Sequence, residues 1–228
     1  MDKLTGARIV TLQNHIAEVL NQTSEDSRVP EKQQAEMLGE CCGQACGLLG
    51  EWLQGPAESL RPAADTPVKE MIKDRAAFEE FLVAMLGAAQ ARASRYGMKV
   101  NDELIEQARK AIAETVRKKP RLKSQELFAI ATERVSQLHS AVCDLATRLH
   151  QGAQGPAIAR IARRVLKKVV ELLPDLVIGM SAVALTQAGH DLSVFGHEAI
   201  KMVMTSHIAY IAQLGLHLKL SPGGPTLG

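Results

Sequence analysis

The sequence predicts an all-α fold, a multi-helix bundle of about seven or eight helices with apolar C-terminal helices at the core. Three observations support this prediction. Residues of high helix propensity (Ala, Leu, Glu, Gln, Lys and Arg) dominate the 228-residue chain. Strand-forming residues do not collect into alternating runs. Hydrophobic residues make up 46% of the chain and charged residues 23%, a balance typical of a globular protein with its own core.

The first two predicted helices lie in the N-terminal quarter. The first covers residues 4–20, because Ile9, Leu12 and Ile16 recur at helical spacing. The polar loop NQTSEDSRVP ends it, and Pro30 marks the start of a second helix that reaches residue 53. The proline-rich segment GPAESLRPAADTP that follows is the best candidate for a domain boundary.

The third and fourth predicted helices follow this segment. The third covers residues 68–96 and ends at Gly97. Asn101 or Asp102 caps the fourth, which stops before Pro120 because proline cannot continue a helix.

The fifth and sixth predicted helices flank the segment QGAQGP. Ser124 is the predicted cap of the fifth helix, which ends near His150. The sixth helix starts at Pro156 and ends at Pro174. Its apolar and charged side chains separate onto two opposite faces of a helical wheel, so one face is expected to pack against the core.

Two apolar helices complete the predicted bundle, with a break near AGHDLSVFG. Residues 176–189 carry no formal charge, and residues 202–218 have apolar side chains all round the helix. Both are shorter than the roughly 20 residues needed to cross a bilayer, so we expect them in the bundle core. A hairpin that inserts into a membrane and a groove filled by a partner remain the alternatives. We expect an acidic helical pair at 1–55, a main bundle at 68–220 and a flexible tail at 221–228, which are also compatible with one continuous domain.

Charge is unevenly distributed along the chain. Residues 1–90 carry 8 basic and 14 acidic side chains, whereas residues 91–170 carry 17 basic and 7 acidic ones. The formal net charge of +2 therefore combines an acidic first part, near −6, with a basic middle part, near +10.

Two clusters dominate the basic middle part. We call residues 117–123 (RKKPRLK) the basic turn and the charged side of the sixth helix the basic helix face. The candidate polyanion-binding residues are Arg117, Lys118, Lys119, Arg121 and Lys123 in the basic turn and Arg160, Arg163, Arg164, Lys167 and Lys168 on the basic helix face. Such clusters indicate a phosphate-bearing partner, a salt-bridged contact with the acidic first 90 residues, or an ordinary solvated surface.

The cysteines and histidines form no recognisable metal motif in the sequence. Cys42 and Cys46 are four residues apart, but no Cys-x-x-Cys pair or well-placed histidine completes a tetrahedral site. We therefore expect the four cysteines to be buried and reduced, and no metal or cofactor is predicted. A metal- or cofactor-dependent enzyme that uses the C-terminal histidines is an alternative; these are His190, His197, His207 and His217.

Together these features predict a non-enzymatic helical scaffold or interaction protein. It binds a polyanion, either a nucleic-acid backbone or an anionic membrane surface, and self-associates as a homo-oligomer in the manner of a nucleoprotein or matrix protein. The aromatic content of 3% favours contacts with phosphates over base stacking. A membrane-active bundle is the second alternative. The charged N-terminus lacks a secretion signal, so the predicted location is intracellular and cytoplasmic, at most peripheral to a membrane.

Overall fold

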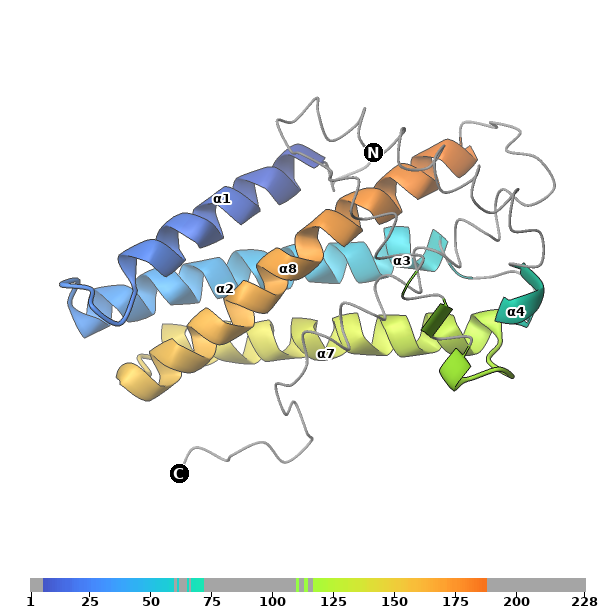
Figure 1. Cartoon of the computed structure of the whole chain (residues 1–228). Coiled ribbons are helices and arrows are strands. Elements are labelled where there is room, and N and C mark those ends of the chain that lie inside the picture. Colours follow the sequence, from blue (N-terminus) through green and yellow to red (C-terminus); the bar gives the residue numbers. More distant parts are fainter. Residues whose placement is uncertain are drawn as a thin grey trace.

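Four long helices build the part of the chain that the structure describes (Figure 1). The computed structural model describes residues 6–59, 61, 65, 67–71, 110, 113–114 and 117–187. The long helices are α1 (Gly6–Gln22), α2 (Glu31–Gln54), α7 (Ser124–His150) and α8 (Pro156–Gln187), and the short ones are α3 (Pro56–Ser59) and α4 (Val68–Met71). No strand occurs among these residues, so the prediction of an all-α protein is confirmed for them.

The helices form two antiparallel hairpins that pack on each other. α1 and α2 run in opposite directions, as do α7 and α8 (Figure 1). α2 contacts α1, α7 and α8, and α8 crosses α2 while also contacting α1 and α7. The first two helices therefore share one core with the basic middle part, and a domain boundary after residue 55 stays a prediction.

The shared core uses the apolar positions expected from helical spacing. Ile9 and Ile16 of α1, Leu38 of α2 and Leu166 of α8 are fully buried. The apolar side of α8 packs inward as predicted; its buried members are Ile158, Ala162, Val165, Leu166, Val169 and Leu172.

A glycine-containing turn ends α7 where the segment QGAQGP predicts it. The backbone N–H of Ala153 donates to the carbonyl of Arg148, and that of Gly152 donates to Leu149. This pair of hydrogen bonds is the Schellman arrangement, which satisfies carbonyls at the end of a helix. Gly152 has a φ of 93° and Gly155 a φ of 109°, a region that side-chain-bearing residues rarely adopt.

Two predicted helix boundaries are wrong in detail. The helix that begins at Pro156 does not end at Pro174 but continues to Gln187 as one 32-residue helix. Proline removes one backbone donor and discourages a helix locally, but packing along a long helix can override that cost. Residues 176–187 are thus the continuation of α8 and not a separate helix.

The start of α7 is also built differently from the prediction. Ser124 is the first helical residue and is buried, and Lys123 precedes it without a side-chain cap. The carboxylate of Asp65, 60 residues before Gln125, accepts the Gln125 backbone N–H at 3.4 Å. The carboxylate of Asp65, which is distant in sequence, therefore lies at the N-terminal end of α7, where the helix dipole is positive.

Several predictions fall on residues outside the described ranges. These are the helix over 68–96 beyond α4, the start of the helix before Pro120, the segment 202–218 and the tail 221–228. The predicted total of seven or eight helices stays a prediction for the same reason. Among the helices that the structure describes, none combines the length and the apolar character needed to cross a membrane.

Candidate functional site

The basic helix face covers the outer side of the first half of α8. Arg160, Arg164 and Lys167 are exposed, whereas Arg163 and Lys168 are half-buried at its edges. Their spacing of four and three residues places the three exposed cations on one side of the helix. Since the opposite side is fixed in the core, the charged side is held toward solvent.

Arg163 and Arg160 are directed toward the loop that joins α1 and α2. The Arg163 guanidinium donates through Nη1 to the Thr23 carbonyl, at the end of α1. Arg160 Nε lies 3.9 Å from a carboxylate oxygen of Glu25, and both side chains are largely exposed. Arg163 thus holds α8 against this loop, which is a structural role that the sequence does not reveal.

Of the other three cations of the basic helix face, one pairs with a carboxylate and two have no acidic partner among the described residues. Lys168 pairs with Glu171 one turn later, at 2.7 Å. Arg164 and Lys167 make no ion pair with any residue that the structure describes. These two side chains are therefore the ones most available to an external anion.

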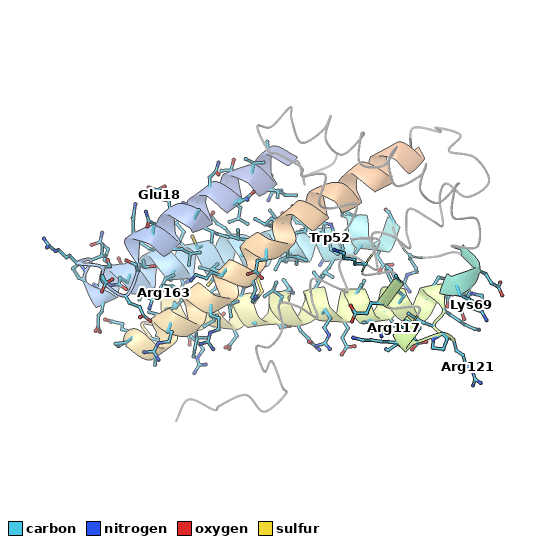
Figure 2. All side chains as sticks on the ribbon, viewed as in Figure 1. Glu18, Trp52, Lys69, Arg117, Arg121 and Arg163 are labelled. Atoms are coloured by element: carbon cyan, nitrogen blue, oxygen red, sulfur yellow. A yellow bond between two sulfur atoms is a disulfide. The ribbon has the colours of Figure 1, made fainter. Side chains whose placement is uncertain are left out.

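The basic turn lies between α4 and α7, where Figure 2 labels Arg117 and Arg121. All five of its basic side chains are exposed. Buried Leu122 anchors the turn to the core. Lys118 pairs with Glu114, and Lys123 donates to Asp65 at 2.9 Å. Within the described ranges, Lys119 and Arg121 have no ion-pair partner.

The two basic clusters do not form one continuous surface. The basic turn precedes the start of α7, and α8 begins beyond its other end, so Arg121 and Arg163 lie toward opposite ends of the bundle (Figure 2). α7 has 27 residues, and at 1.5 Å per residue the clusters lie about 20–35 Å apart along the bundle. This exceeds the screening length of about 8 Å at physiological salt, so the two clusters are electrostatically independent of each other.

Two ion pairs connect the basic middle part to the acidic first 90 residues, which is one of the contacts considered from the sequence. The pairs are Arg160 with Glu25 and Lys123 with Asp65. Exposed pairs of this kind contribute about 0–1 kcal/mol each. They engage two of the ten candidate residues and leave Arg164, Lys167, Lys119 and Arg121 unpaired among the described residues.

A hollow of about 350 Å³ lies beside the basic helix face, between the α1–α2 loop and the start of α8. Arg160 and Arg163 line it together with Glu25 and Glu31. Since carboxylates and guanidinium groups face the same space, its charge favours neither an anion nor a cation. The hollow is therefore not a phosphate pocket.

A second candidate site lies between α2 and α7, which a disulfide connects. Cys46 and Cys143 form a disulfide; their Cα atoms are 5.2 Å apart and the two residues are 97 positions apart in sequence. The expectation that all four cysteines are reduced is thus wrong for this pair. The close packing of α2 on α7 brings the two residues together, and sequence spacing gives no sign of it.

His139 completes this second site. Its Nε2 lies 3.8 Å from Cys46 Sγ, and the side chains of Cys46, His139 and Cys143 are all half-buried. The ring fits because α2 has a glycine opposite it: a Cβ added to Gly50 would lie 3.1 Å from His139 Nε2. The sequence carries one signal of this site, since His139 and Cys143 are four residues apart on α7.

The other two cysteines match the prediction of buried, reduced thiols. Cys41 and Cys42 are free and have no exposed surface. Burial raises the pKa of each thiol from about 9 to about 12, with a smaller contribution from nearby negative charge. Cys42 therefore does not join Cys46 in a metal-binding pair, although the two are four residues apart.

These raised pKa values predict a pH-dependent loss of stability. Above pH 9 the unfolded chain loses the two thiol protons while the folded chain retains them, so stability should fall as the pH rises from about 9 toward 12. Urea unfolding at pH 8 and pH 10.5 measures this. The double variant Cys41→Ala with Cys42→Ala, which lacks both groups, should lose less stability over that interval than the unaltered protein. An equal loss in both proteins would contradict the assignment.

Comparison with known proteins gives no relative for this chain. No family model matches it, no curated protein is significantly similar in sequence, and no solved structure is significantly similar to its fold.

Proposed function

We propose that this protein is a non-enzymatic helical scaffold that binds nucleic-acid backbones through the basic helix face. The observation that supports the proposal is the pair of exposed cations, Arg164 and Lys167, with no carboxylate partner among the described residues. Lys and Arg side chains that contact phosphates position a protein on nucleic acid without reading its bases. The basic turn, with Lys119 and Arg121, supplies a second and separate contact.

The packing of α8 favours nucleic acid over an anionic membrane as the partner. A helix that binds at a membrane surface places its apolar face among the acyl chains. In this bundle, that face of α8 is buried against α1, α2 and α7. The basic helix face therefore offers charge without an apolar face to insert, which is sufficient for a phosphate backbone.

Self-association and the two alternative functions stay predictions. The first arm of the membrane-active hairpin, residues 176–187, is the C-terminal part of α8, and its second arm, residues 202–218, lies outside the described ranges. An enzyme built on the C-terminal histidines depends on His190, His197, His207 and His217. These four histidines lie outside the described residues.

Neutralising the two unpaired cations of α8 tests the proposal. Arg164→Gln with Lys167→Gln should weaken binding to a short fluorescent DNA duplex by about 10–100-fold near 0.1 M salt. Each phosphate contact contributes about one to the magnitude of the negative slope of log K against log salt. The loss of two contacts should therefore reduce that magnitude by about two. Fluorescence anisotropy across a salt series measures both quantities.

The matched control removes two exposed cations outside the basic helix face, in the adjoining and more acidic α1–α2 region. Arg28 and Lys32 lie in and after the α1–α2 loop, next to the acidic residues Asp26 and Glu31. Arg28→Gln with Lys32→Gln has the same charge change and should leave duplex binding almost unaltered. Equal weakening by both double variants would show that net charge, and not the basic helix face, governs binding. Binding to vesicles rich in anionic lipid without binding to duplex would overturn the choice of nucleic acid.

A further inference from the structure

The Cys46–His139–Cys143 cluster has a chemistry that polyanion binding does not use. One ligand atom from each of the three side chains lies within 4.8 Å of the other two. α2 supplies Cys46 and α7 supplies both His139 and Cys143, so two packed helices position all three. No other group of three His, Cys, Asp or Glu side chains with this closeness occurs in the described part of the chain.

We propose that the reduced Cys46 and Cys143 thiols and the His139 imidazole bind a divalent transition metal of the zinc class. Thiolate sulfur and imidazole nitrogen are the ligands that zinc prefers, in a tetrahedral arrangement. Ligand atoms in such a site lie about 3.6 Å apart, given metal–ligand distances of about 2.1–2.3 Å. The 3.8 Å between Cys46 Sγ and His139 Nε2 is close to this separation.

Charge and access also suit a metal. Two thiolates neutralise one divalent cation and His139 is a neutral ligand, so the half-buried site gains no net charge on binding. All three side chains retain some exposure, which gives the ion an entry path and leaves a fourth coordination position for water or another ligand. The absence of a Cβ at Gly50 leaves room for the imidazole between the helices.

Metal binding and the disulfide exclude each other. A dithiol reductant transfers two electrons and two protons to the Cys46–Cys143 disulfide, breaks the S–S bond and is itself oxidised to a disulfide. The two thiols that result lose their protons when the metal binds, since the thiolate is the ligand. Under oxidising conditions Cys46 and Cys143 therefore form the cross-link, and under reducing conditions the two thiolates and His139 bind the metal.

Cobalt provides the probe for this site. The protein is reduced with a dithiol, separated from the reductant under anaerobic conditions and titrated with Co²⁺. We expect one Co²⁺ per chain, with thiolate-to-cobalt charge-transfer bands and the strong visible bands of tetrahedral Co²⁺, and we expect Zn²⁺ to displace it. The oxidised protein should show none of these bands.

Variants assign the bands to the three ligands. Cys46→Ser, Cys143→Ser and His139→Ala should each lose the one-to-one tetrahedral spectrum. Gly50→Ala favours the helix but crowds His139, so it should weaken Co²⁺ binding while the protein stays folded. Cys42→Ala is the matched control, because it removes a neighbouring cysteine that faces the core, and it should retain the spectrum.

Three results would overturn the proposal. The first is the same spectrum in oxidised protein, and the second is the same spectrum in Cys46→Ser. The third is a reduced protein that takes up no Co²⁺, whether far-UV circular dichroism shows its helices retained or lost, because the proposed site requires the reduced α2–α7 pair to assemble around the metal.

Discussion

Replacing Trp52 with alanine is expected to lower the free energy of unfolding by about 3–5 kcal/mol. Trp52 is the only tryptophan of the chain, is 1% exposed and lies near the C-terminal end of α2 (Figure 2). Its truncation removes the largest side chain of the core and leaves a cavity that the surrounding helices cannot fully close. Because natural domains are stable by about 5–15 kcal/mol in total, this change alone brings the protein close to unfolding.

Chemical denaturation followed by far-UV circular dichroism measures this loss. Trp52→Phe is the matched variant: it keeps most of the volume and removes an indole N–H that has no acceptor among the described residues. We expect it to cost less than about 1.5 kcal/mol. A loss below about 1 kcal/mol for Trp52→Ala would show that the end of α2 is not packed as described.

Removing the Cys46–Cys143 cross-link is expected to lower the stability of the oxidised protein by about 2–4 kcal/mol. The disulfide joins residues 97 apart in sequence, so it restricts a large loop of the unfolded chain. Because loop entropy grows with loop length, this cross-link is near the upper end of the range that the chain-entropy account gives.

The double variant Cys46→Ser with Cys143→Ser, compared with the unaltered protein in urea, measures this effect without added metal. A dithiol reductant should lower the unfolding midpoint of the unaltered protein and leave that of the double variant in place. If the reductant moves neither midpoint, the two sulfurs are not joined in the folded protein. This outcome concerns the cross-link alone and is separate from the cobalt titration of the reduced thiols.

Sequence periodicity predicts the helices well where one apolar face repeats along a segment. α1, α2 and α7 begin and end within about two residues of the prediction, and the glycine turn after His150 ends α7 as expected. Local preferences are less reliable at Pro174 and Ser124. Packing carries α8 through the proline, and a carboxylate from 60 residues earlier replaces the predicted cap of α7.

The candidate sites also combine features that follow from local sequence with features that depend on long-range packing. The sequence by itself determines that the described part of the chain is helical, that Arg160, Arg164 and Lys167 lie on the outer face of a helix and that the five basic side chains of residues 117–123 are exposed. These properties follow from spacing and composition within short segments.

Only the tertiary structure decides which of these groups remain unpaired and which distant residues meet. It commits Arg163 to the Thr23 carbonyl, separates the two basic clusters and brings Cys46 to Cys143 and His139. The physical reason is that periodicity specifies which face of each helix is buried, whereas the neighbour that covers that face is selected by the packing of the whole bundle.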